Sequence, residues 1–381
     1  DRPVTWRGFG ADMPVVRGTG SKAKTSPVLY AAADHVRLAR LQIDGAFNSA
    51  SAVQVQATGV WLVGLQIYGF GQHGIGVGNV PDTFIAGNLI RDGGTRPNLD
   101  HGIWVTGQGA RIRDNVVTDL PNGYGIFLQY QTQSSARVFA NVVRNVAGGG
   151  IGLSRVKGGN HIYNNIVWSV GTSQGCRCAV EVAYGKLGGE PSTEDRVYFN
   201  TFLGPGFTGL FLADRDGSVQ LHGNVFADFR VGIRVDDEVS TAALASSHNL
   251  WYRADEPPQF KWAGPWLDYT QFQNESDQER PSLLADPKLV DPAAGDAHLA
   301  PGSPAAGGTA GTAGAGGASG SGGGAGGTGP DGGARDNPAP NDDDGRGCGC
   351  SVPGGNGGSG VGWGLTLAAV AGTWRRRRSV P

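Results

Sequence analysis

The chain repeats a four-residue phrase: glycine, an apolar residue, any residue, and a second apolar residue. It occurs at 74–77, 102–105, 125–128, 150–153, 209–212 and 232–235, and 178–182 fills the gap. A second phrase, asparagine followed by any residue and an apolar residue, starts at Asn88, Asn115, Asn141, Asn165, Asn200, Asn224 and Asn249. Most steps are about 23–28 residues, a period typical of solenoids. The repeat therefore predicts stacked coils that each bury an apolar face against their neighbours.

The length of the unit selects the kind of solenoid. A propeller blade needs about 40–45 residues, whereas about 25 residues suffice for three short strands and three turns. Residues 36–43 and 60–67 alternate apolar and polar side chains, which predicts strands before the main repeats. We therefore predict an all-β fold, a right-handed parallel β-helix with two internal ladders. The first ladder is Ile75, Ile103, Ile126, Ile151, Val180, Leu210 and Ile233, and the second is Val77, Val105, Leu128, Leu153, Val182, Leu212 and Val235.

The repeated asparagines are predicted to have a structural role. Asparagine tolerates the left-handed turn conformation, and its side-chain amide can bond to the asparagine of the next coil. We expect these residues to hold the turns together rather than to contact a ligand.

Composition divides the chain of 381 residues into three parts. Residues 1–306 carry the coils, 307–346 form a Gly/Ala-rich and then acidic flexible linker, and 347–381 form a tail. Glycine accounts for 66 residues, many of them in the linker. The net charge of −2 and the pI near 6.4 give no indication of a nucleic-acid partner.

Residues 285–292, 295–299 and 302–305 resemble the closing block of exported β-helix proteins. Together with the coil repeats, they make the chain similar to the pectate-lyase-like β-helix superfamily over about 300 residues. That resemblance implies the fold but not the activity, because the superfamily includes lyases, hydrolases, epimerases, adhesins and inactive binders.

The tail contains Cys348 and Cys350, then an apolar stretch at 361–374 and four arginines at 375–378. The stretch is short for an independent membrane span, which needs nearer 20 residues. The segment resembles the myxobacterial C-terminal sorting signal. This implies export, removal of the tail by a sorting protease, and attachment to the cell envelope near Cys348 or Cys350. A simple membrane tail is the alternative. Cys176 and Cys178 would form either a strained local disulfide or two free thiols.

Alternate residues of a strand face opposite ways, so aligned coils predict columns on the outer surface. Trp104, Phe127 and Phe211 share one column with Glu181, and Tyr130, Arg155, Tyr184, Asp214 and Asp237 share another. His73, His101 and Tyr124 align in a third. Aromatic faces beside arginine and aspartate favour a polysaccharide groove. Its predicted substrate-binding residues are Trp104, Phe127, Tyr130, Tyr184, Phe211 and His101. Alternatively, loops such as 91–100 or 186–196 cover Trp104, Phe127 and Phe211.

The resemblance also suggests catalytic chemistry, because lyases of this superfamily use a basic residue and neutralise a uronate with calcium or another cation. Arg155, with Lys157 beside it, could be the base or the neutralising cation. Glycoside hydrolysis needs two facing carboxylates, for which Glu181 and Asp214 are the best pair.

Asp214, Asp216 and Asp237 fall on adjacent coils and could hold Ca²⁺ through oxygen ligands. None of these residues matches a motif, and ordinary solvated turns use the same residue types. His101 could act in acid–base chemistry or simply pack in a turn. The alternative function is a non-catalytic structural or adhesive surface protein.

Overall fold

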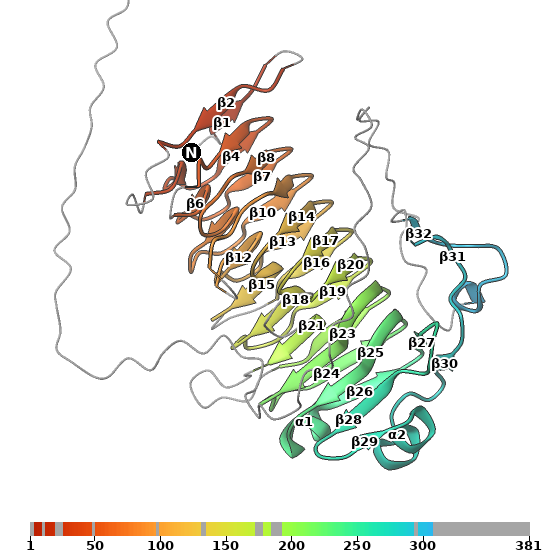
Figure 1. Cartoon of the computed structure of the whole chain (residues 1–381). Helices are drawn as coiled ribbons and strands as arrows, with labels where there is room; N and C mark the ends of the chain where they lie inside the picture. Colours follow the sequence, from red (N-terminus) through yellow and green to blue (C-terminus); the bar gives the residue numbers. More distant parts are fainter. Residues whose placement is uncertain are drawn as a thin grey trace, which may run out of the picture. The chain divides into compact units, whose positions relative to one another are not determined.

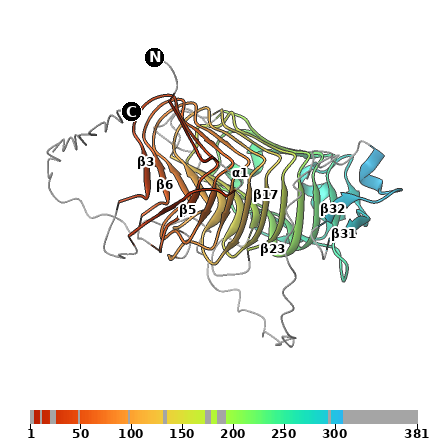
Figure 2. The same ribbon diagram turned by 90° about the horizontal axis from the view of Figure 1, so that it is seen from above.

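The computed structural model describes residues 4–9, 12–19, 26–47, 50–96, 99–130, 135–171, 178–183, 193–292 and 296–307. These residues form a right-handed parallel β-helix, as predicted, whose coils follow one another along the axis (Figure 1). Figure 2 shows the coils stacked one behind another. The linker beyond residue 307, the tail with Cys348 and Cys350, and Cys176 lie outside the described residues.

Three faces run along the solenoid. Face A precedes the repeated asparagines and consists of β1 (Val4–Arg7), β4 (Val36–Ala39), β7 (Trp61–Val63), β10 (Phe84–Ala86), β13 (Arg111–Arg113), β16 (Arg137–Phe139), β19 (His161–Tyr163), β22 (Asp195–Tyr198), β24 (Val219–His222) and β26 (Leu244–Ser247).

Face B follows the asparagines and consists of β2 (Val15–Arg17), β5 (Gln42–Asp44), β8 (Gln66–Tyr68), β11 (Leu89–Arg91), β14 (Val116–Leu120), β17 (Val142–Val146), β20 (Ile166–Val170), the first parts of β23 (Thr201–Ala213) and β25 (Val225–Val235), β27 (Leu250–Tyr252) and β30 (Leu283–Leu284). Face C contains the glycine phrases and consists of β3 (Leu29–Ala31), β6 (Val53–Val55), β9 (Ile75–Val77), β12 (Ile103–Val105), β15 (Tyr124–Gln129), β18 (Gly149–Ser154), β21 (Cys178–Ala183), the second parts of β23 and β25, β28 (Gln259–Trp262) and β29 (Trp266–Leu267). The long strands β23 and β25 each turn from face B into face C, which joins the two faces into one sheet.

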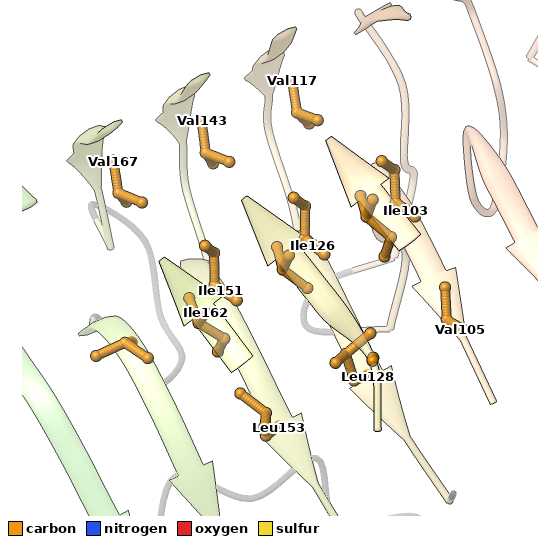
Figure 3. Packing of buried hydrophobic residues seen from close by; sticks show 14 of the residues in the cluster. Ile103, Val105, Val117, Ile126, Leu128, Val143, Ile151, Leu153, Ile162 and Val167 are labelled. Carbon is orange, nitrogen blue, oxygen red and sulfur yellow. The ribbon is translucent and has the colours of Figure 1, made fainter. Parts of the chain in front are cut away.

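Both predicted internal ladders are confirmed. The strand register pairs Ile75, Ile103, Ile126 and Ile151 coil by coil, and continues through Val180 to Ile233. Every member of both ladders is fully buried, and Figure 3 shows several of them stacked with residues of the other faces. Because each coil contributes the same shape, the core is continuous along the axis.

The asparagines form the predicted ladder between faces A and B. The side-chain nitrogen of Asn165 donates to the side-chain oxygen of Asn200 (2.9 Å), and that of Asn141 donates to Asn165 (2.9 Å). The left-handed residue is not the asparagine but the one before it, such as Asn164 at φ 54° or Gly223 at φ 64°. The asparagine therefore satisfies buried polar groups beside a corner that its predecessor makes.

That corner also divides the two stretches that alternate before the main repeats. Residues 36–43 give β4 and β5, separated at Arg40 (φ 53°). Residues 60–67 contain β7 and the first two residues of β8, and Gly64 (φ 62°) lies between the two strands. The alternation predicts strands correctly, but it does not mark the sharp bend between them.

Two helices follow the last complete coils, α1 (Glu238–Ala243) and α2 (Tyr269–Ser276). Phe272 of α2 stacks on Phe260 of the core with ring centroids 4.7 Å apart. The hairpin of β31 (Leu289–Asp291) and β32 (Asp296–Leu299) and the short 3-10 helix η1 (Pro304–Gly307) end the described chain. Within the described ranges, no helix combines the length and apolar character that a membrane-crossing segment requires.

Candidate functional site

The outer column of face C has the predicted register but not the predicted exposure. Trp104, Phe127, Glu181 and Phe211 follow one another through the paired strands, with Gly152 between Phe127 and Glu181. Phe127, Glu181 and Phe211 are each no more than 1% exposed, and Trp104 is half-buried. The expectation of an exposed aromatic row is therefore wrong for Phe127 and Phe211. Much of the 186–196 loop offered as their cover, residues 186–192, lies outside the described residues.

Glu181 forms the centre of this buried cluster. The hydroxyl of Tyr124 donates a hydrogen bond to its carboxyl group from two coils away. The glycines of β18 make this reach possible, because a Cβ on Gly149 would lie 2.4 Å from the Tyr124 ring. Burial raises the pKa of Glu181 to about 8, although the bond from Tyr124 acts in the opposite direction. Glu181 is therefore a protonated acid at neutral pH.

Two neutral histidines extend the cluster. The backbone N–H of His101 donates to Nδ1 of His73 (3.0 Å), and that of Tyr124 donates to Nδ1 of His101 (3.0 Å). Burial lowers the pKa of His73 to about 3 and that of His101 well below its ordinary value; nearby Arg96 lowers both further. His73 also stacks on Trp104 at 4.9 Å. His101 thus lies in a packed, hydrogen-bonded turn and contacts Tyr124 and Phe127 rather than Glu181 itself.

The predicted carboxylate pair has two different environments. Glu181 is buried and protonated, whereas Asp214 is exposed and its backbone N–H donates to Asp237 (2.8 Å). The side chain of Arg155 donates to the hydroxyl of Tyr130 (2.8 Å) and lies over its ring. The structure thus brings Arg155 and Tyr130 together, as their column predicts. Tyr184 lies outside the described residues.

The structure does not arrange the predicted calcium ligands as a metal site. The Asp237 carboxylate caps helix α1 by accepting from the backbone N–H of Ser240 (2.8 Å), and it also accepts from the Ser240 hydroxyl (2.7 Å) and the Asp214 N–H. Among the residues that the structure describes, one buried carboxylate oxygen of Asp216 has no hydrogen-bond partner. Over the described parts of the chain, no three His, Cys, Asp or Glu side chains are grouped to hold a metal ion. The prediction of a site at Asp214, Asp216 and Asp237 is not supported.

Of the two cysteines predicted to form either a local disulfide or free thiols, the structure describes only Cys178. Cys178 is buried at the start of β21 and is disulfide-bonded. The other three cysteines of the chain lie outside the described residues.

Face A carries a second row of functional groups, which the sequence analysis missed. Phe139, Tyr163 and Tyr198 stack with ring centroids 4.9 and 5.1 Å apart and interplanar angles of 4° and 7°. Towards the N-terminus the guanidinium of Arg113 bridges Phe139 and Phe84. The rings are half-buried, so the row lies along the solvent side of the sheet.

A column of three arginines and one histidine runs parallel to these rings. The register aligns Arg111, Arg137, His161 and Arg196 on successive strands. Arg137 donates to three backbone carbonyls, and Arg196 pairs with Glu194. Among the described residues, neither Arg111 nor Arg137 has a carboxylate partner within ion-pairing distance. We call the rings and this column the face A lane.

The pKa of His161 shows how the neighbouring charged groups act on this residue of the lane. Partial burial lowers the pKa of His161, and the guanidinium groups of Arg137 and Arg196 lower it further. Glu194 acts in the opposite direction but is the smallest contribution. Each of the two guanidinium groups thus affects the pKa of His161 more than Glu194 does.

A sequence signal for the lane exists. Four of the seven turn asparagines share this signal: Asn115, Asn141, Asn165 and Asn200. They are preceded, four residues earlier, by Arg111, Arg137, His161 and Arg196, and two residues earlier by Arg113, Phe139, Tyr163 and Tyr198. Alignment of the coils on the asparagine rather than on the glycine would have revealed both columns.

Residues 28–167 match the family model described as "Right handed beta helix region". No curated protein matches the sequence. Among solved structures, a lacto-N-biosidase from Eubacterium ramulus is similar, with 11% identity and a TM-score of 0.45 over 75% of this chain and 57% of that one. A DFA-IIIase from Arthrobacter chlorophenolicus has 13% identity and a TM-score of 0.29, over 61% of this chain and 67% of that one. A Pseudomonas phage tailspike has 16% identity and a TM-score of 0.27, over 61% and 47%.

Proposed function

We propose that the protein binds an anionic polysaccharide along the face A lane. The observation that carries the proposal is the column of Arg111, Arg137, His161 and Arg196 at strand spacing on the solvent side of one sheet. Neighbouring strands lie about 4.8 Å apart, a spacing comparable to the rise of one sugar in an extended chain. A polymer lying along the solenoid axis could therefore present successive carboxylates to successive coils.

The geometry of the rings favours an anion over a neutral sugar. Phe139, Tyr163 and Tyr198 use their faces to stack on one another, so solvent meets their edges. The edge of an aromatic ring is its positive part, whereas a sugar that stacks needs the face. Edges, tyrosine hydroxyls and guanidinium groups together form a surface suited to carboxylates.

The test compares polygalacturonate with the same polymer after methyl esterification, which keeps the backbone and removes the charge. We expect the whole protein to bind only the charged form, and more weakly at high salt because exposed charges are screened. The double substitution Arg111→Gln and Arg137→Gln should lower the affinity by about tenfold or more, since tenfold corresponds to about 1.4 kcal/mol.

The matched control is Arg91→Gln on face B, which removes an exposed arginine paired with Asp92. It should bind polygalacturonate as the unchanged protein does. Equal binding of the esterified polymer, or equal loss in the control and the double variant, would refute the proposal.

Cleavage of the glycan is a second candidate, favoured by one observation. A general acid must be protonated near neutral pH and must reach the substrate. Glu181 meets the first condition, and because it is only 1% exposed, catalysis requires that the residues covering it move aside. The expected result is release of reducing ends that Glu181→Gln abolishes while lane binding is retained. Unchanged product formation in that variant would remove Glu181 from any catalytic role.

Export and attachment to the cell envelope are part of the same proposal, and they are supported by the sequence of the tail alone. Cell fractionation of a source strain should find the protein in the envelope. Replacement of both Cys348 and Cys350 by serine should release it or leave the tail uncleaved, whereas an unchanged distribution would count against the sorting signal.

A further inference from the structure

A cavity of about 810 Å³ lies on face B near the C-terminal end of the solenoid. It is separate from the face A lane and from the cluster around Glu181. Small-ligand sites commonly measure about 300–1,000 Å³, so this volume suits a ligand rather than a single water.

The floor of the cavity is one register column. Trp168 of β20, Leu203 of β23, Ala227 of β25 and Tyr252 of β27 are paired in that order. The two aromatic residues are therefore three strand steps apart, or about 14 Å, with smaller side chains between them. The segment around Leu289 forms a wall, because it packs against this column.

The two aromatic residues differ from those of the face A lane in one respect. Among the described residues, no ring stacks on Trp168 or Tyr252 and no cation lies over either. Both are half-buried and line the cavity. Their rings pack against the aliphatic side chains of the column but have no ring partner, so the ring surface that lines the cavity is available for a sugar to stack on.

The charges that line the cavity balance. They come from three carboxylates and three cations: Asp228, Asp255, Asp286, Arg230, Arg253 and Lys288. Asp228 and Asp286 each accept one backbone hydrogen bond, from Ala254 (3.2 Å) and from Lys288 (2.8 Å), and keep a second oxygen. Arg253 is also paired with Glu256 beside the cavity (2.5 Å), so the site offers several acceptors and no excess of cations. Such a site suits a neutral, hydroxyl-rich ligand rather than an anion.

We propose that this cavity binds a short neutral oligosaccharide, with Trp168 and Tyr252 as apolar platforms at its two ends and the carboxylates accepting from sugar hydroxyls. A ligand that spans about 14 Å contacts both platforms at once. The site differs in ligand class from the anionic lane, so either can be correct without the other.

Saturation-transfer NMR on the whole protein tests this proposal with maltotriose, cellotriose and mannotriose, and with trigalacturonate as the charged comparison. At least one neutral trisaccharide should bind, and trigalacturonate should not compete with it. Trp168→Ala should weaken neutral binding by about tenfold or more. Tyr30→Ala, at an exposed aromatic residue outside the cavity, is the matched control and should have no effect.

Asp255→Asn addresses the case in which Trp168→Ala does not fold. Asp255 is exposed and asparagine fits the same space, but asparagine has no charge and replaces one acceptor oxygen by an N–H donor group. We expect several-fold weaker binding of the neutral sugar and unchanged binding of polygalacturonate. Absence of neutral binding, or neutral binding that survives both substitutions, overturns the proposal. Loss of polygalacturonate binding in the Arg111 and Arg137 variant bears on the face A lane alone.

Discussion

The buried acid at Glu181 should make stability depend on pH in a way that one substitution removes. Its pKa is about 8 in the folded protein, against 4.5 for an ordinary glutamate. Between these values the unfolded chain releases a proton that the folded chain keeps. The folded state therefore binds more protons, and the free energy of unfolding falls as pH rises.

The size of the effect follows from the same two values. Each pKa unit is worth about 1.4 kcal/mol, so the interval from 4.5 to about 8 corresponds to about 5 kcal/mol. This contribution is fully present below pH 4.5 and is lost by about pH 8. It is large beside a total stability of about 5–15 kcal/mol.

The assay is urea unfolding of the whole protein and of Glu181→Gln across this pH range. Glutamine keeps an oxygen to accept from Tyr124 but does not ionise. Because His73, His101 and other buried groups titrate in both proteins, only the difference between them is interpreted. The free energy of unfolding of the unchanged protein minus that of Glu181→Gln should fall by about 5 kcal/mol from pH 4.5 to pH 8. The variant is therefore expected to gain stability relative to the unchanged protein as the pH rises.

The control is Glu275→Gln on the exposed side of α2, which should give a difference that is constant with pH. A solenoid can unfold in segments, so the slope of the unfolding curve must be unchanged for the comparison to hold. A difference for Glu181→Gln that stays within about 1 kcal/mol across the range would refute the reasoning.

Three other predictions follow from single contacts. Asn165→Ala leaves the buried N–H of Asn141 without its acceptor and removes the side-chain amide bonds to the neighbouring coils. The free energy of unfolding, measured by urea titration, should therefore fall by about 3–5 kcal/mol. The control Asn274→Ala, at an exposed position, should change it little. The pKa of His161, followed by NMR, should rise when polygalacturonate binds, because carboxylates would offset the neighbouring guanidinium groups; an unchanged value would place the polymer elsewhere. Asp237→Ala should lower the free energy of unfolding by about 1–2 kcal/mol through loss of the α1 cap. Added Ca²⁺ should leave the melting temperature of the unchanged protein as it is. If Ca²⁺ stabilises the unchanged protein but not Asp237→Ala, the metal hypothesis is restored.

The repeat determined the coils because a period of about 25 residues admits few arrangements. Ile103 and Ile126 stack as predicted, since a strand that slipped by one residue would expose its whole inward row. The ladder of asparagines was also predictable, because each amide is both donor and acceptor and repeats at the same corner. These features depend on neighbouring coils that carry the same phrase, so the local pattern contains all the information.

Exposure and protonation were decided by the tertiary structure alone. Phe127, Glu181 and Phe211 occupy outward positions, yet they are buried, because alternation along a strand says which side a residue faces and not what covers that side. The pKa of Glu181 depends on that cover and on Tyr124 two coils away. The cavity on face B brings Trp168 together with residues near Leu289, far along the chain, which no repeat predicts. Repetition thus determines contacts between equivalent positions, whereas a site assembled from non-equivalent ones exists only once the chain has folded.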